Sequence, residues 1–355
     1  MKWSFLILYL FVSVQCFTQV VRKDIDSRFR RGIITDQFIY TDSVIAQCHA
    51  STLVETRNGL LAAWFGGTGE GNNDVCIYTS RLIKGVWTKP VIAADGQIND
   101  STRYACYNPV LFQVPGKELL LFYKIGPEVQ KWTGWMKRSF DDGKTWTRAE
   151  ALPQAVLGPV RNKPLYLNGW LICPSSTEKG GWKVHFEYSK DLGKTWTIGP
   201  DLNDGKTISG IQPAVIRLSS QKLLALCRSQ NGTINQSYSN DNGLNWSNLE
   251  ATTMVNNNSS IDAITLKDGR HLLVHNNTHP TPGDPEGRGP RSPLNLSIST
   301  DGIHWKEVLL LENEKGAEFS YPYIIQTSDG LVHISYTWKR KKIKYIVVQP
   351  KKLKS

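Results

Sequence analysis

The chain of 355 residues lacks several patterns by which folds and sites are commonly recognised. No segment shows the 3.6-residue apolar period of an amphipathic helix, and no run after the first sixteen residues is apolar and long enough to cross a bilayer. Low-complexity linkers are also missing, as is any break that would separate a second domain. These absences favour a single all-β domain without a membrane span.

The six cysteines show no paired spacing of the kind that metal sites or disulfide frameworks need. Five lie in or beside apolar, strand-like runs, where buried free thiols are expected: Cys48, Cys76, Cys106, Cys173 and Cys227. His275 and His279 have a metal-like spacing, but a strand-to-loop context would place their side chains apart. The Gly-rich stretch FGGTGEGNND is followed by neither a helix nor a Lys-Ser/Thr pair, which disfavours nucleotide binding. We therefore expect no metal and no other cofactor.

Positive charge is in excess, with 42 Lys and Arg against 31 Asp and Glu. Such an excess favours acidic partners, and we expect an acidic glycan rather than nucleic acid. Part of the charge lies in KRKKIKY at 339–345 and in the basic tail 351–355, which we interpret as a solvated last strand and tail.

The N-terminal stretch MKWSFLILYLFVSVQC has a basic residue followed by an apolar run. This pattern is typical of a secretory signal peptide, here over residues 1–19, and predicts a secreted or periplasmic protein. Lipid attachment at Cys16 is disfavoured because the bulky Gln15 stands where a small residue is expected.

One short motif occurs four times. Ser-x-Asp-x-Gly-x-x-Trp stands at 139–146, 189–196 and 239–246, and a shortened copy, STDGIHW, at 299–305. The Asp can accept hydrogen bonds from N–H groups of the turn, the Gly can adopt the positive φ of a tight hairpin, and the Trp can cover the hairpin's end. We therefore expect the four Asp to stabilise hairpins rather than to take part in catalysis.

A second repeat indicates the fold. At intervals of 49 to 59 residues a polar residue precedes a short apolar strand: His49, Asn108, Lys163, Gln212, Asp262 and Tyr321. A turn and a second strand follow each time, and a third strand leads into the motif above. Periods of this length predict a six-bladed β-propeller over 33–350, in which the stretch 33–46 supplies an outer strand to the last blade. We expect the protein to be a monomer.

The innermost strands of a propeller begin around one mouth of its central channel. The six polar residues are therefore predicted to form a ring in which they face one another, and convergent polar groups in a cleft indicate a binding site. The alternative is that each residue only satisfies a strand end exposed to solvent.

The four motifs resemble the Asp-boxes of the sialidase (neuraminidase) superfamily, and the likeness extends over nearly the whole mature chain. In that family three Arg hold a substrate carboxylate, a Tyr activated by a Glu is the nucleophile, and an Asp protonates the leaving group. The resemblance implies that Tyr321 in SYPYIIQTSDG is the nucleophile. It also implies that Arg228 in LCRSQNG and Arg291 in PRSPLNLSISTDG are the second and third Arg. GEGNNDVCIYTS at 69–80 matches the segment that follows the acid.

Three positions depart from the family pattern. His49 stands at the first Arg, Gln212 at the Glu, and Gly69, next to Glu70, at the acid Asp. The chain is therefore interpreted as a divergent sialidase-like branch.

The departures change the expected roles. Gln212 cannot accept the proton of Tyr321, so we expect Asp262 to do so, with His49 as the other base within reach and otherwise in contact with the substrate. Glu70, on its Gly-rich loop, is expected as the general acid.

The remaining site residues are expected to bind the substrate. Arg228 and Arg291 can each hold a carboxylate through two parallel hydrogen bonds, and Gln212, Lys163 and Asn108 would extend the pocket.

Three functions follow from these residues. The first is a secreted sialidase-like glycoside hydrolase that removes a terminal acidic sugar from glycans. The second is a polysaccharide lyase acting on uronic acid-containing glycans, in which Arg228 or Arg291 neutralises the uronate while His49 and Tyr321 move the proton. The third is a propeller that binds glycans without catalysis, as loss of the family's residues at His49 and Gln212 would allow.

Overall fold

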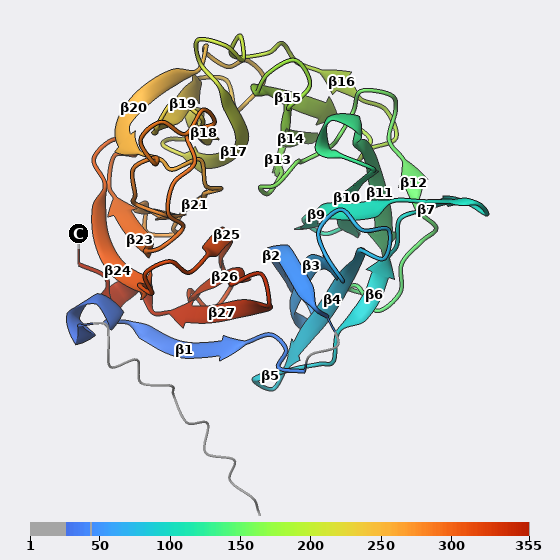
Figure 1. Ribbon diagram of the computed structural model, residues 1–355, viewed down its shortest axis with the longest axis horizontal. Coiled ribbons are helices and arrows are strands. Elements are labelled where there is room, and N and C mark those ends of the chain that lie inside the picture. Colours follow the sequence, from blue (N-terminus) through green and yellow to red (C-terminus); the bar gives the residue numbers. More distant parts are fainter. Residues whose placement is uncertain (1–25, 43–44, 355) are drawn as a thin grey trace, which may run out of the picture.

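Six β-sheets surround a central axis in the computed structural model, which describes residues 26–42 and 45–354 (Figure 1). The all-β, six-bladed propeller predicted from the repeats is confirmed. The signal peptide predicted for residues 1–19, with Cys16, lies outside the described residues.

The first three blades follow one another along the chain, each an antiparallel sheet. Blade 1 contains β2 (Gln47–Thr56), β3 (Gly59–Gly67), β4 (Cys76–Ile83), β5 (Val86–Trp87) and β6 (Val91–Ala94). Blade 2 contains β9 (Ala105–Gln113), β10 (Leu119–Gly126), β11 (Thr133–Ser139) and β12 (Glu150–Ala151). Blade 3 contains β13 (Leu165–Leu167), β14 (Trp170–Thr177), β15 (Lys183–Ser189) and β16 (Thr197–Ile198).

The last three blades complete the circle. Blade 4 contains β17 (Gly210–Arg217), β18 (Leu223–Ser229), β19 (Thr233–Ser239) and β20 (Glu250–Val255). Blade 5 contains β21 (Asp262–Thr265), β22 (His271–His275), β23 (Leu294–Ser299) and β24 (Lys306–Glu312). Blade 6 contains β25 (Phe319–Gln326), β26 (Val332–Trp338), β27 (Lys342–Val348) and β1 (Ile33–Phe38).

Few other elements are present in the described part of the chain. They are the hairpin β7 (Gln97–Asn99) with β8 (Thr102–Arg103), and the 3₁₀ turns η1 (Ser27–Arg30), η2 (Val129–Lys131) and η3 (Pro350–Lys352). None of the helical turns is long and apolar enough to pass through a bilayer.

The ring is closed by a strand from each end of the sequence. β1 pairs antiparallel with β27, as expected for the stretch 33–46, and forms the outer edge of blade 6 (Figure 1). The expectation of a solvated last strand was wrong, because β27 is almost entirely buried and its Lys344 forms an ion pair with the buried Asp36 of β1. The tail is also held, since Arg270 donates to the carbonyl groups of Pro350 and Leu353.

The repeated Asp motif closes hairpins as predicted. In the copy at 189–196, Asp191 Oδ1 accepts from the backbone N–H groups of Lys194 and Thr195 at 3.0 and 2.8 Å. Gly193 adopts a φ of +93°, and the indole of Trp196 donates to its carbonyl at 3.0 Å. The hydroxyl of Thr195 donates to Asp191 Oδ2 at 2.7 Å, and this bond, together with those from the backbone N–H groups, holds the pKa of Asp191 below its ordinary value. The motif therefore has a structural function.

The apolar core lies largely between neighbouring blades. One cluster joins Val110 and Phe122 of blade 2 to Leu171 and Cys173 of blade 3, and a similar cluster joins blades 5 and 6. The five cysteines in the described residues are buried and free, as predicted. This packing fixes the inner strands around the channel, which positions the site described next.

Candidate functional site at the channel mouth

Four innermost strands carry the same irregularity near their beginning. The register of pairing shifts between His49 and Thr52 in β2, Tyr107 and Val110 in β9, Ile211 and Ala214 in β17, and Ser320 and Tyr323 in β25. Each shift contains a residue with positive φ: Ala50 at 54°, Asn108 at 39°, Gln212 at 58° and Tyr321 at 51°. Such bulges redirect side chains, and they are common beside active sites.

The bulges correct the predicted ring of six. By register the counterpart of Tyr321 in blade 1 is Ala50, so His49 lies one position earlier. Asp262 of blade 5 pairs with Val274, and the equivalent pair in blade 6 is Tyr323 with Ser335. Asp262 is therefore the counterpart of Tyr323, which lies two residues after Tyr321. The polar residues therefore occupy two layers, because β21 has no bulge.

Tyr321 lies half-buried at the mouth and is surrounded by cationic side chains. Its hydroxyl oxygen accepts a hydrogen bond from Arg228 Nη1 at 2.9 Å. The guanidinium carbons of Arg161, Arg228 and Arg291 lie 5.5, 5.8 and 6.0 Å from the centre of its ring. The structure thus brings Tyr321, Arg228 and Arg291 into one site.

Arg161 fixes the backbone of Tyr321. Its Nη2 donates to the carbonyl oxygens of Tyr321 and Pro322 at 2.7 and 2.8 Å, and its side chain is fully buried. A non-glycine residue with positive φ costs conformational energy, and these two hydrogen bonds stabilise that backbone geometry.

Arg228 is buried and tied to blades 4 and 5. Nη2 donates to the backbone oxygen of Asn258 at 2.7 Å and also contacts its side-chain oxygen, while Nη1 lies 3.4 Å from Gln212 Oε1. Its guanidinium carbon lies 4.8 Å from the centre of the Trp182 ring. Burial lowers the pKa of Arg228, which the nearby Tyr321 opposes.

A chain of alternating charges borders the mouth. Glu318 Oε1 accepts from Arg291 Nη1 and from Arg340 Nε, each at 2.8 Å. Arg340 also forms an ion pair with Glu70, so the expected general acid lies on this rim. Glu318 and Arg340 were missed by sequence reasoning, since Arg340 stands in the basic run that was interpreted as solvated. The signal was available, because the β26–β27 turn opens at the same mouth as the beginning of β25.

His49 is buried against Tyr321, with ring centres 4.0 Å apart. Neither imidazole nitrogen has a hydrogen-bond partner among the described residues. Burial, followed by the positive charges of Arg340 and Arg291, lowers the pKa of His49 well below its ordinary 6.5. The imidazole is therefore neutral near pH 7.

Asp262 does not meet the hydroxyl of Tyr321, contrary to expectation. Its carboxylate oxygens accept from Lys163 Nζ at 2.7 and 2.6 Å, and Oδ2 also accepts from the backbone N–H of Ile324 at 2.8 Å. This fully buried carboxylate links blades 3, 5 and 6. Lys163, which was expected to bind the substrate, is therefore occupied by its ion pair with Asp262.

The other two expected substrate-binding residues lie at bulges. Asn108 is buried in β9, and Gln212 in β17 is held through its backbone, whose N–H donates to Ser176 Oγ at 3.2 Å. His275, considered as a metal ligand, lies 2.8 Å from Ser297 Oγ through its Nε2. No group of three His, Cys, Asp or Glu within the described ranges is arranged to hold a metal ion.

Comparisons with known proteins agree with this architecture. The family model described as a BNR repeat-like domain matches residues 58–334. A protein of unknown function from Dyadobacter fermentans is 16% identical, with a TM-score of 0.73, over 90% of this chain and 99% of its own. The Hadza microbial sialidase Hz136 is 16% identical with a TM-score of 0.74, over 90% and 69% of the two chains. The intramolecular trans-sialidase from Ruminococcus gnavus is 14% identical with a TM-score of 0.68, over 91% and 99%. The fold is therefore that of sialidases.

Proposed function

The chain belongs to the BNR repeat-like domain family, and on that premise we propose that it is a secreted glycoside hydrolase that removes a terminal acidic sugar from glycans. The observation that carries the proposal is the position of Tyr321, whose hydroxyl is bound to Arg228 while Arg291 lies over the same ring. A phenol among guanidinium groups suits a substrate that carries a carboxylate at the reacting carbon.

The acidic group would be bound by the cations at the mouth. Arg291 and Arg340 are partly exposed. Arg291 keeps guanidinium nitrogens beyond the one that it donates to Glu318, and Arg340 keeps Nη2 beyond those bound to Glu318 and Glu70. Guanidinium groups bind carboxylates through paired hydrogen bonds. Arg340, from the β26–β27 turn, would supply the cation that His49 does not provide.

The chemistry follows from the charge of the substrate. A carboxylate nucleophile would be repelled by a substrate carboxylate attached to the anomeric carbon, whereas a neutral phenol is not. Tyr321 would attack the anomeric carbon as the bond to the leaving group breaks. Glu70, having given up Arg340 to the substrate carboxylate and taken a proton from water, would pass that proton to the leaving group, and water would then cleave the glycosyl–tyrosine bond. With Asp262 bound to Lys163, the neutral His49 is the group beside Tyr321 that can accept its proton.

The test is a screen of glycans with terminal acidic sugars for release of a reducing monosaccharide. Wild type should release the sugar, and Tyr321→Phe should abolish release while keeping affinity for the substrate. An unchanged rate in Tyr321→Phe would remove Tyr321 from the mechanism. Binding of acidic glycans by the wild type with no product would instead support the non-catalytic function.

The position of the neutral His49 against Tyr321, with ring centres 4.0 Å apart, favours one second candidate, a lyase acting on uronic acid-containing glycans. A lyase needs a cation on the uronate and a neutral base to remove the proton from the adjacent carbon. Its product contains a carbon–carbon double bond that absorbs ultraviolet light, and a hydrolase leaves no such product. Absorbance during digestion therefore separates the two functions.

Secretion is part of the proposal and rests on the N-terminal apolar run. Expression with and without residues 1–19, followed by assay of the medium or periplasm, tests it. Equal retention of both forms in the cytoplasm would contradict export by this segment.

A further inference from the structure

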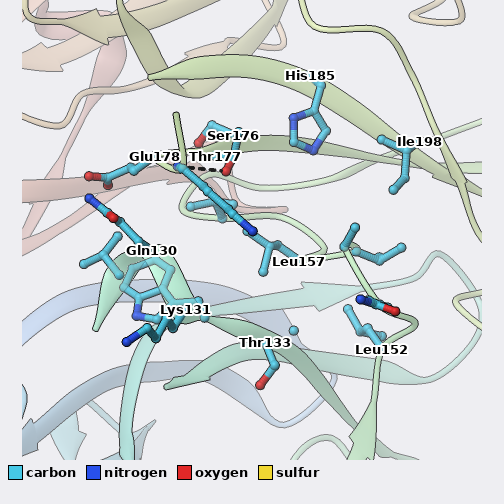
Figure 2. A pocket seen from close by; sticks show the side chains of 18 of the residues that line it. Gln130, Lys131, Thr133, Leu152, Leu157, Ser176, Thr177, Glu178, His185 and Ile198 are labelled. Atoms are coloured by element: carbon cyan, nitrogen blue, oxygen red, sulfur yellow. Dashed lines mark hydrogen bonds between the residues drawn. The ribbon is translucent and has the colours of Figure 1, made fainter. Parts of the chain in front are cut away.

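A cavity of about 520 Å³ lies beside the channel mouth, between blades 2 and 3. It is bounded by η2 and the beginning of β11 on one side, and by the end of β14 and the beginning of β15 on the other. The connection between the blades, residues 152–157, forms its floor (Figure 2). This volume lies within the range of about 300–1,000 Å³ that small-molecule sites occupy.

The walls of the cavity are of two kinds. Leu152, Val156 and Leu157 give an apolar floor, and the half-buried Trp132 adds an aromatic side chain. Hydroxyl, amide and charged groups surround this floor: Gln130, Lys131, Thr133, Ser176, Thr177, Glu178, Lys179 and Asp201. A sugar ring has the matching character, with apolar C–H faces and a rim of hydroxyl groups.

One polar group in the wall is buried and fixed. His185 is 5% exposed and lies over the cavity in Figure 2, with its Nε2 3.2 Å from Glu187 Oε1. Glu187 is fully buried and also accepts from the backbone N–H groups of Leu157 and Gly158 at 3.0 and 2.6 Å. The Nδ1 of His185 has no hydrogen-bond partner in the described part of the chain, and the nearest carboxylate oxygen, Asp201 Oδ1, lies 3.9 Å from it. When Nε2 donates to Glu187, Nδ1 is the ring nitrogen that remains for a hydrogen bond with a ligand hydroxyl.

The cavity wall is connected to Tyr321 through the side chains of Trp182 and Arg228. Ser176, in the cavity wall, accepts from the backbone N–H of Gln212 at the mouth. Trp182 donates to Glu178 Oε2 at 3.0 Å and stacks against Arg228, which binds Tyr321. Burial raises the pKa of Glu178, and Arg228 acts against that rise, so the carboxyl group lies within the field of the site.

We propose that this cavity is a second sugar subsite, which takes the uncharged sugar next to the acidic one held at Tyr321. The inference rests on the proposed function and extends it, because it makes the substrate an oligosaccharide rather than any acidic glycoside. Charge distinguishes the two subsites. Arginine dominates the mouth, whereas Lys131 and Lys179 are balanced by Glu178 and Asp201 at the cavity.

The test compares a free acidic sugar with the same sugar linked to lactose. The probes are N-acetylneuraminic acid with 3′-sialyllactose, and glucuronic acid with its lactose-linked form, titrated calorimetrically into Tyr321→Phe protein so that nothing is consumed. The linked form of the accepted sugar should bind about tenfold more tightly than the free form.

Filling the cavity should remove that difference. Leu157→Trp, made in the same background, should weaken binding of the linked probe to the level of the free sugar and leave the free sugar unaffected. Leu244→Trp, at an exposed leucine on the Asp motif of blade 4, is the matched control and should change neither. His185→Phe should weaken the linked probe alone, and an unchanged melting temperature in each variant shows that the fold is kept.

Two results would overturn the subsite. One is equal affinity of free and linked sugars in the parent protein, and the other is an equal loss for both probes in Leu157→Trp. Failure of the proposed function is seen separately, as a wild-type protein that shows the linked-sugar preference but releases no sugar. Absence of binding by every probe would overturn both proposals.

Discussion

Arg291 and Arg340 donate to the same oxygen of Glu318, each over 2.8 Å, which holds the two guanidinium groups together, with that of Arg291 over the ring of Tyr321. These two arginines come from different segments, one preceding β23 in blade 5 and the other in the last turn of blade 6. Two neighbouring cations repel each other, and a shared carboxylate keeps them together at an anion-binding mouth. Glu318 is therefore a positioning residue.

Removing that carboxylate should weaken binding of acidic sugars. In Glu318→Gln the shared charge is lost, and we expect affinity for an acidic sugar to fall by about tenfold or more while affinity for its uncharged methyl ester changes little. Calorimetric titration of both ligands measures the effect. Equal losses for acid and ester would indicate a general disturbance of the mouth.

Arg340 should be essential for charge recognition although it lies in a basic run of sequence. Arg340→Lys keeps the charge but loses the planar group that donates to Glu318 and contacts Glu70, and we expect KM for acidic substrates to rise about tenfold or more. Arg148→Lys, at an exposed arginine beside the Asp motif of blade 2, is the matched control. The prediction fails if both variants have the same kinetics.

The Lys163–Asp262 pair should matter for stability more than for chemistry. Lys163→Met leaves a buried carboxylate without its cation, and we expect the free energy of unfolding to fall by about 3–5 kcal/mol. The double variant Lys163→Met/Asp262→Asn should recover much of that loss. Urea denaturation measures both changes, and activity retained by the double variant would show that Asp262 is not the base for Tyr321.

Low pH should weaken the charged rim. The pKa of Glu318 is lowered below its ordinary 4.5, since burial, which would raise it, is outweighed by Arg291 and Arg340. A carboxyl group with a lowered folded-state pKa stabilises the fold above its unfolded-state value, and that contribution is lost as pH falls below about 4.5 through the folded-state value. Unfolding measured from pH 7 to pH 3 should show a smaller loss in Glu318→Gln than in wild type.

The Asp motif should affect stability and leave activity unchanged. Asp241→Ala removes the acceptor of backbone N–H groups of Leu244 and Asn245, and we expect the free energy of unfolding to fall by about 1–2 kcal/mol. Thermal unfolding with activity assays at low temperature measures both. A large fall in kcat with a normal melting temperature would contradict a purely structural function.

The fold was predictable because its determinants are local and repeated. Ser239, Asp241, Gly243 and Trp246 build their hairpin from contacts within eight residues, and the same letters recur in three other blades. The closing strand was predictable for a related reason, since the last blade lacked one strand and the stretch 33–46 remained unassigned.

The site was less predictable because it depends on single-residue shifts. A bulge in β2 places Ala50 where the sequence suggested His49, and the absence of one in β21 places Asp262 beside Lys163. Local sequence does not fix such shifts, as the bulge at Ala50 has no proline after it whereas those at Asn108, Gln212 and Tyr321 do. Arg340 was missed because charge runs are usually solvated, and only the fold shows that its turn faces the mouth.

The joining of β1 to β27 has a consequence for how the protein forms. β1 precedes all six blades in the chain and its partner belongs to the last of them, so the circle stays open until blade 6 has been synthesised. Blades 1 to 5 can assemble in succession, but the buried Asp36 acquires Lys344 only when the final hairpin arrives. Cutting the chain after blade 5 should therefore leave β1 unpaired and the first and fifth blades with uncovered apolar faces, a form prone to self-association rather than a smaller stable propeller.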